Sequence, residues 1–476
     1  MTVERVTVGI PGLELLTCGG LPRSRLTLVT GTAGSGKTVF AAQFLASGIA
    51  GSGGTGVFVT FEERPESIRR NMRSFGWDIE AWEAEGRWMF VDASPRQEDT
   101  VFTGDDYDLS PLLARINNAV ARTGATRVAI DSIGALVTQF AHQGPARRAL
   151  FRLGTALEAT GVTTVMTAER PDDYGPVAQL GFEEFLADNV IVLRNGLNGE
   201  KRRRTLEVLK MRGSPHLRGE HLFTLLDGGI VVVPVAIQNF EYGSSTARQT
   251  SGVPELDEML GGGLFEKSLW LVAGPTGTGK SMLSAQFVAA GAQSGQRVLL
   301  HSFEESRAQL ARNAAAWGID FDAMEAAGNL RVVAEAPESA PLEDHLQRMK
   351  LAIDEFEPDR VAIDSLTALQ RIATVRGFRE YVLGLTFYIK LRASLGLVTS
   401  SVGHFLREEA TNDLHVSTIS DAITLLHYLP VAGEMRRGVQ VLKIRGSDHD
   451  KAVREFMITD TGMRVEQPFP DISTLF

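Results

Sequence analysis

The sequence predicts an α/β protein made of two tandem domains, each with a mostly parallel β-sheet flanked by helices. The chain has 476 residues, which is long for one core and suits two domains of roughly 240 residues each. Short β-branched runs alternate with amphipathic stretches, as in RLTLVT, KTVFAAQFLASGIA and TGVFVTF. This alternation is typical of βαβ units. Several motifs also recur in one fixed order, which indicates a duplicated domain.

The repeat is visible in four motifs. GTAGSGKT at residue 31 returns as GPTGTGKS at residue 274, and FEE at 61 returns at 303. RVAIDS at 127 recurs unchanged at 360, and VLKMRG at 208 recurs as VLKIRG at 441. The first copy is longer in the polar stretch ASPRQEDTVFTGDDYD, which we expect to be a surface loop. We place the domain boundary near residue 240, which gives domains 1–240 and 241–476.

Composition narrows the class of protein. The 43% hydrophobic and 22% charged residues are close to the averages of folded soluble proteins. The formal net charge of -10 argues against sequence-independent binding to nucleic acid. Cys18 is the single cysteine, so an internal disulfide or a cysteine-based zinc site is not possible. The sequence has no signal-peptide pattern and no apolar run of about 18 residues, and we expect a cytoplasmic protein without a membrane or nucleic-acid partner.

Each glycine-rich motif has the sequence and context of a phosphate-binding P-loop, because it follows a strand and opens a helix. Backbone N–H groups of such a loop surround phosphate oxygens, and the helix N-terminus adds a favourable dipole. We expect Lys37 and Lys280 to contact the β- and γ-phosphates of ATP, and Thr38 and Ser281 to coordinate Mg²⁺. The predicted loop residues are Gly31, Thr32, Ala33, Gly34, Ser35, Gly36, Lys37, Thr38 and Val39 in the first copy and Thr276, Gly277, Thr278, Gly279, Lys280, Ser281 and Met282 in the second.

Each RVAIDS motif is a buried strand that ends in a carboxylate, Asp131 or Asp364. An aspartate in this position after a P-loop can hold the magnesium-bound water near the phosphates. Taken alone, such an aspartate is more often a capping or turn residue. Its repetition behind both P-loops favours the metal site, whose predicted residues are Thr38, Asp131, Ser281, Glu304 and Asp364.

Two glutamates follow another short strand in each copy, Glu62 and Glu63 in the first and Glu304 and Glu305 in the second. One of each pair can orient a water or hydroxyl for attack on the γ-phosphate. Adjacent strand residues point to opposite faces, so the two should not do the same job. We favour Glu62 and Glu304 as the closer participants. The alternative is that these acids cap the helices of EERPESI and EESRAQL.

The last repeated motif places two cations two residues apart on one strand, Lys210 and Arg212 in the first copy and Lys443 and Arg445 in the second. That spacing aims both side chains at one target. If ATP lies between subunits, the pair can reach a neighbour's phosphates and stabilise the transition state. A solvated basic strand is the alternative. The repetition, with its shared RGS continuation, favours the role in trans.

These motifs lie within long strings that resemble one family, the KaiC proteins, which are tandem RecA-like ATPases and autokinases of the cyanobacterial circadian clock. The resemblance spans nearly the whole chain. It includes GGLPRSRLTLVTGTAGSGKT, TTVMTAERPDDYGPVA and RRRTLEVLKMRGSPH in the first copy, and EESRAQLARNAAAWGIDF, PESAPLEDHLQ and HVSTISDAI in the second. It implies two RecA-like domains and a homohexamer of two stacked rings, with ATP and Mg²⁺ bound between neighbouring subunits of each ring.

The resemblance also implies which residues line each nucleotide site. These are Ser74, Lys210, Met211, Arg212, Ser214, His216 and Asp227 in the first copy and Trp317, Arg437, Lys443, Ile444, Arg445, Ser447, His449 and Lys451 in the second. It implies that the first ring is a slow ATPase that engages a KaiB-like protein. The second ring is expected to phosphorylate and dephosphorylate itself on Ser417 and Thr418. The first copy carries Glu184 and Phe185 at the equivalent positions, so only the second copy has hydroxyl acceptors.

Members of the family usually continue into a tail that binds KaiA, whereas this sequence ends at Phe476. We therefore do not expect a KaiA-like partner, and we expect phosphorylation without an activator. Two other classes of function stay open on the sequence alone. A RecA-like, DNA-dependent ATPase is one, although the acidic charge argues against it. A nucleotide-gated signalling scaffold with an idle kinase is the other.

Overall fold

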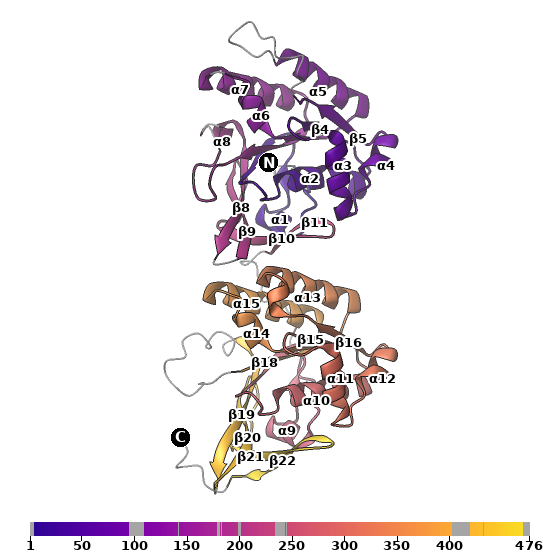
Figure 1. Cartoon of the computed structure of the whole chain (residues 1–476), viewed down its shortest axis with the longest axis vertical. Coiled ribbons are helices and arrows are strands. Elements are labelled where there is room, and N and C mark those ends of the chain that lie inside the picture. Colours follow the sequence, from indigo (N-terminus) through magenta and orange to yellow (C-terminus); the bar gives the residue numbers. More distant parts are fainter. Residues whose placement is uncertain are drawn as a thin grey trace. The chain divides into compact units, whose positions relative to one another are not determined.

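The chain forms two compact units, Met1–Ile237 and Gln238–Phe476, each built on its own sheet (Figure 1). The computed structural model describes residues 4–94, 109–140, 142–178, 181, 183–198, 201–233, 243, 245–401, 419–431 and 433–469. The predicted surface loop between the FEE and RVAIDS motifs of the first copy lies mostly outside these residues. In the described part of the chain, no helix is both long and apolar enough to cross a membrane.

The first unit contains a nine-stranded sheet in the order β11-β10-β9-β8-β3-β7-β6-β4-β5. Strands β3 to β8 pair in parallel, and β8 to β11 form an antiparallel extension. The bounds are β3 Leu26–Gly31, β4 Gly56–Thr60, β5 Trp88–Asp92, β6 Arg127–Asp131, β7 Thr163–Glu169, β8 Asn189–Asn198, β9 Lys201–Met211, β10 Glu220–Leu226 and β11 Gly229–Val233. A small separate ladder joins β1 Arg5–Val6 to β2 Leu21–Pro22.

The second unit repeats this topology strand for strand, in the order β16-β15-β17-β18-β14-β19-β20-β21-β22. The bounds are β14 Ser268–Ala273, β15 Val298–Ser302, β16 Leu330–Ala334, β17 Arg360–Asp364, β18 Leu395–Ser400, β19 Ala422–Val431, β20 Glu434–Ile444, β21 Arg454–Thr459 and β22 Gly462–Pro468. The small ladder of this unit joins β12 Arg248–Gln249 to β13 Leu264–Phe265. The predicted fold class, two α/β domains with mostly parallel sheets, is confirmed.

Helices cover both faces of the first sheet because its central strands are apolar on both sides. Leu28, Val57 and Val59 pack with the helices α5, α6 and α7, whereas the alternate residues Val29 and Phe58 pack with α1 to α4. The bounds are α1 Leu13–Leu16, α2 Lys37–Ser52, α3 Pro65–Met72, η1 Arg73–Phe75, α4 Ile79–Ala84, α5 Ser110–Thr123, α6 Ile133–Val137, α7 Gln143–Ala159 and α8 Glu183–Leu186.

The helices of the second unit follow the same order along the chain. Helices α9 to α12 share one apolar core with β14, β15 and β19. The bounds are α9 Pro254–Met259, α10 Lys280–Gln293, α11 Arg307–Ala315, α12 Phe321–Ala326, η3 Pro337–Ser339, α13 Leu342–Phe356, α14 Leu366–Gln370 and α15 Val375–Arg392. The strand that leads into each P-loop, β3 or β14, lies inside its sheet and is buried along its whole length.

Candidate nucleotide-binding sites

Each P-loop needs glycine for steric reasons. Gly36 and Gly279 have φ angles of 96° and 110°, which residues with a Cβ adopt only under strain. A Cβ on Gly31 would lie 2.6 Å from the carbonyl oxygen of Leu193, and one on Gly274 would lie 2.4 Å from that of Leu426. The helices α2 and α10 begin directly at the P-loop lysines. Their unpaired first-turn N–H groups therefore border the loop, as an anion site requires.

The P-loop lysines bend back over their own loops. The Lys37 Nζ donates to the carbonyl oxygens of Gly31 and Thr32, both at 3.0 Å. The Lys280 Nζ donates to those of Gly274 and Pro275, at 2.8 and 2.9 Å. Burial lowers the pKa of Lys280, and the nearby carboxylates of Asp364 and Glu304 oppose this effect. A phosphate group would replace weak carbonyl acceptors with a full negative charge.

The aspartates at the ends of β6 and β17 are held in the same way in both units. The Thr167 hydroxyl donates to Asp131, and the Thr399 hydroxyl donates to Asp364. Burial raises the pKa of both carboxyls, and hydrogen bonds from these threonines and from Thr38 or Ser281 oppose the increase. A hydroxyl beside a buried carboxylate is an oxygen-only donor set, which suits Mg²⁺ with its retained waters.

The two glutamates of each pair have different partners. In the second unit the Ser365 hydroxyl donates to Glu304 at 2.9 Å, whereas the Asn313 amide donates to Glu305 at 2.8 Å. Burial is the main cause that raises the pKa of Glu305, and the Asn313 hydrogen bond lowers it. The two acids of the pair therefore lie in different hydrogen-bonding environments, and their division of roles stays a prediction.

The first unit repeats this arrangement with one looser contact. Ser132 donates to Glu62 at 3.0 Å, as its counterpart does, but Asn71 lies 3.4 Å from Glu63. Burial raises the pKa of Glu63, with further increases from Asp131 and Glu62.

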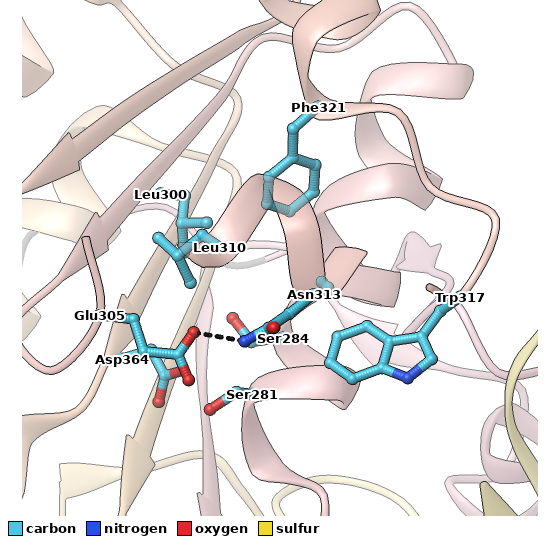
Figure 2. Close-up of a pocket in the computed structure, with 10 residues that line it drawn as sticks. Ser281, Ser284, Leu300, Glu305, Leu310, Asn313, Trp317, Phe321 and Asp364 are labelled. Carbon is cyan, nitrogen blue, oxygen red and sulfur yellow. Dashed lines mark hydrogen bonds between the residues drawn. The ribbon is translucent and has the colours of Figure 1, made fainter. Parts of the chain in front are cut away.

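A pocket in the second unit brings several of these groups together (Figure 2). Ser281 and Asp364 line it, and so do Glu305 and Asn313, whose hydrogen bond is the dashed line in the figure. The ring of Trp317, which the resemblance assigns to the nucleotide site, also lines it. The remaining lining residues are Ser284, Ala285, Leu300, Leu310 and Phe321.

The predicted basic pairs lie level with the opposite end of the P-loop strand, β3 or β14, from the P-loop itself. We call the border of the sheet where β3 or β14 begins the basic edge, and the border where the P-loop follows the P-loop edge. Strand register pairs Thr27 with Asn189 and Asn189 with Met211, so the Lys210 region is level with the start of β3. Gly31, where the P-loop begins, is four residues further along β3, or about 13 Å at ~3.3 Å per residue. The second unit has the same offset, because Trp270 pairs with Ala422, which pairs with Ile444.

A β-bulge precedes the end of each basic strand. The register shifts opposite Val190 in the first unit and opposite Ile423 in the second, which leaves Leu209 and Leu442 unpaired and 45% exposed in each case. Bulges of this kind redirect the side chains that follow. The shared bulge therefore sets the direction of both cation pairs.

The lysines of these pairs bind backbone carbonyl groups of the segment that precedes β8 in the first unit and β19 in the second. The Lys443 Nζ donates to the carbonyl oxygen of Ser420 at 2.8 Å, and the Lys210 Nζ donates to those of Glu184 and Ala187 at 2.9 and 2.7 Å. Burial lowers the pKa of both lysines, and the neighbouring arginine of each pair adds to this. Ser417 and Thr418 themselves lie outside the described residues.

The other predicted residues divide between the two edges. Ser74 donates to the Asn71 carbonyl, near the glutamates, and Asp227 lies in the turn between β10 and β11, whose Leu225 flanks Gly36. Arg437 stacks on Tyr428, which donates to the Gly277 carbonyl at 2.6 Å, so it lies on the P-loop side. The residues at the basic edge are Ser214 and His216 in the first unit and Ser447, His449 and Lys451 in the second, each after its basic strand.

Sequence reasoning missed the residues that hold the acids. These are Ser132, Thr167 and Asn71 in the first unit and Ser365, Thr399 and Asn313 in the second. The repeat was the available signal, because each residue recurs at nearly the same offset as the neighbouring motif. Sequence reasoning also missed an ion pair of the first unit between Lys37 and Glu169, with 3.7 Å between Nζ and Oε1.

Comparison with known proteins now decides the family. The family model described as "ATPase: KaiC" matches twice, at residues 6–236 and 249–469. The chain belongs to the KaiC family. It is 50% identical over 472 residues to the circadian clock protein KaiC3 of Synechocystis sp., a match that covers 99% of this chain and 93% of that protein. It is 48% identical to the circadian clock oscillator protein KaiC of Synechococcus elongatus and 47% identical to that of Thermostichus vulcanus, each over 98% of this chain and 90% of the relative. The predicted family is confirmed, and both units are KaiC-type ATPase domains.

Proposed function

We propose that this KaiC-family protein is a timing component that uses Mg-ATP for two reactions. The first unit hydrolyses ATP, with Glu62 positioning the water. The second unit transfers the γ-phosphate to Ser417 and Thr418 and later removes it, with Glu304 activating the acceptor hydroxyl. The subunits form a homohexamer in which each site is completed by a neighbour. A KaiB-like protein is the expected partner of the first ring.

One observation supports this proposal: Ser420, close in sequence to the proposed acceptors, lies level with the end of β14 that is farther from its own P-loop. Ser420, two residues after Thr418, is tied to Lys443 at the edge where β14 begins. The P-loop follows the other end of β14, about 13 Å away along the strand at ~3.3 Å per residue. Phosphoryl transfer needs reacting atoms within about 3–3.5 Å. The ATP of a neighbouring subunit resolves this distance, and a head-to-tail ring provides it.

The same argument gives the basic pairs their role. Lys443 and Arg445 leave their strand at the edge that would face the neighbour's P-loop, and their charges would stabilise the transferring phosphoryl group. Burial and mutual repulsion lower the pKa of Lys443 in the isolated chain. A phosphate placed between the two cations would remove that repulsion, so the pair suits an anionic ligand supplied from outside the subunit.

Phosphosite mapping by mass spectrometry tests the second reaction. The protein is incubated with Mg-ATP as wild type, as Lys280→Ala and as Ser417→Ala/Thr418→Ala. We expect phosphate on Ser417 and Thr418 in the wild type alone. Unchanged phosphorylation in Lys280→Ala would exclude the second P-loop as the donor site. The first reaction is followed separately as phosphate release, which Lys37→Ala should abolish in a Lys280→Ala background.

A further inference from the structure

The first P-loop is in contact with an acidic segment, residues 169–173, with the sequence ERPDD. Glu169 is the last residue of β7, next to Gly31 in the strand register. Its carboxylate is 3.7 Å from the Lys37 Nζ, and its side chain is about half exposed, at 52%. The lysine expected to bind the γ-phosphate therefore has an anionic partner within its own chain.

The rest of the segment is fixed to the same loop. The Thr32 hydroxyl donates to Asp173 at 2.8 Å, and the backbone N–H of Asn195 donates to the same oxygen at 3.0 Å. The Arg194 Nε donates to the Asp173 carbonyl at 3.0 Å. The backbone N–H of Arg170 donates to the carbonyl oxygen of Gly31 at 3.3 Å. Glu169 is thus held beside Lys37 by these contacts of the residues that follow it and by the pairing of Ala168 with Thr30 that precedes it.

The second P-loop differs at both contact positions. Pro275 stands in the place of Thr32 and has no hydroxyl. Strand register places Ser401 in the position of Glu169, because Ala273 pairs with Ser400 where Thr30 pairs with Ala168. The Ser401 backbone N–H donates to the Thr367 hydroxyl at 2.7 Å. A serine in this position cannot compete as an anion for Lys280.

We propose that Glu169 is a positioning residue that competes with the γ-phosphate of ATP for Lys37 and so weakens ATP binding at the first site only. When ATP binds, Lys37 exchanges the carboxylate for phosphate oxygens, and Glu169 is left beside a second anion. The cost falls on binding, so it appears in KM rather than in the rate of the chemical step. This inference rests on the proposed ATP hydrolysis by the first unit.

The magnitude is modest because the ion pair is half exposed. Pairs of this kind are screened by solvent and correspond to about two- to five-fold in affinity. In a Lys280→Ala background, which removes the second site, Glu169→Gln should lower the KM for ATP about two- to five-fold and leave kcat within about two-fold. Asp172→Asn is the matched control, since it removes an exposed acid of the same segment for which the described residues show no hydrogen bond or ion pair to the P-loop.

Two results would overturn the inference: a KM equal to that of Asp172→Asn, or a collapse of kcat, which would make Glu169 a catalytic group. The reciprocal graft guards against a folding defect. Ser401→Glu in the otherwise wild-type chain should raise, about two- to five-fold, the ATP concentration for half-maximal phosphorylation of Ser417 and Thr418, and Ser401→Gln should not. An unchanged value for Ser401→Glu would also count against the competition. In the Lys280→Ala background, hydrolysis that survives Lys37→Ala would refute the proposed ATPase function of the first unit. If Lys37→Ala abolishes hydrolysis while Glu169→Gln leaves the KM for ATP unchanged, only the inference about Glu169 fails.

Discussion

Phosphorylation between subunits can be tested by mixing two inactive variants. Lys280→Ala keeps both acceptors but lacks the P-loop lysine, and Ser417→Ala/Thr418→Ala keeps the P-loop but lacks acceptors. Neither should be phosphorylated alone. Together they should complement each other, because the edge of the sheet that holds Lys443 and Ser420 is about 13 Å from the P-loop of the same chain at ~3.3 Å per residue.

The expected yield follows from the ring. In a one-to-one mixture, each Lys280→Ala subunit has one neighbour whose P-loop faces its acceptors, and that neighbour is competent in about half of the cases in a randomly assembled cyclic ring. About half of the intact acceptor peptides should therefore be phosphorylated, relative to wild type. Transfer within a subunit predicts none, so the two hypotheses differ by far more than any error in the mixing ratio.

The assay is mass spectrometry of the acceptor peptide after co-expression and incubation with Mg-ATP. The peptide with Ser417 and Thr418 comes from Lys280→Ala subunits only, so its phosphate reports transfer between chains directly. A second mixture has Arg445→Ala added to the Lys280→Ala subunits, which carry the acceptors. Loss of a charge that acts in trans should slow transfer by about 10³-fold or more if it resembles other arginine fingers. Hexamers of normal size with no phosphorylated acceptor peptide in the mixture would refute the reasoning.

Three further predictions concern single groups. Burial raises the pKa of Asp364, so its charge lowers the stability of the nucleotide-free protein at neutral pH. Asp364→Asn should therefore raise the urea midpoint at pH 7.5 and abolish phosphorylation. The stability difference from wild type should shrink as the pH falls below the raised pKa and vanish below the ordinary pKa of an unfolded aspartate, about 3.9. Asn313→Ala removes the hydrogen bond that lowers the pKa of Glu305. If phosphoryl transfer by Glu304 also needs Glu305 to be ionised, the acidic limb of the phosphorylation pH profile should move to higher pH, and an unmoved limb would assign Glu305 no part in it. Asn71→Ala, whose contact with Glu63 is longer at 3.4 Å, should move the limb of ATP hydrolysis less. Gly229→Ala places a Cβ 2.4 Å from the Gln43 amide oxygen at a φ of 110°, and should lower the free energy of unfolding by about 1–3 kcal/mol; an unchanged unfolding midpoint would contradict this packing.

The sequence predicted the fold well because its strongest signals were local and repeated. Alternating β-branched and amphipathic segments, two P-loops and a shared motif order were sufficient for two α/β domains. It did not predict which strands are neighbours. The pairing of β3 with both β7 and β8 joins segments more than 130 residues apart in sequence, and no local pattern encodes that contact.

The candidate sites were predicted in part for the same reason. Lys37 and Asp131 belong to motifs that can be recognised locally, whereas Thr167 sits in an ordinary strand and gains meaning only when β7 lies beside β6. The Lys37–Glu169 contact could not be read from the repeat either, because the repeat exposes what the two copies share. A difference between copies becomes informative only after strand register aligns Glu169 with Ser401.

That register suggests how one ancestral site could acquire two behaviours. Both units keep the lysine, the aspartate, the paired glutamates and the residues that hold them, so these groups cannot explain a division of labour. Two differences remain. Glu169 lies beside Lys37, whereas strand register puts Ser401 in the equivalent position near Lys280. In the sequence, Ser417 and Thr418 replace Glu184 and Phe185. A site whose ATP competes with an internal carboxylate, and which faces no hydroxyl acceptor, is suited to release phosphate to water. In the proposed function, the second site lacks that competitor and a neighbour's Ser417 and Thr418 serve as acceptors, so it is suited to hold ATP until a hydroxyl arrives.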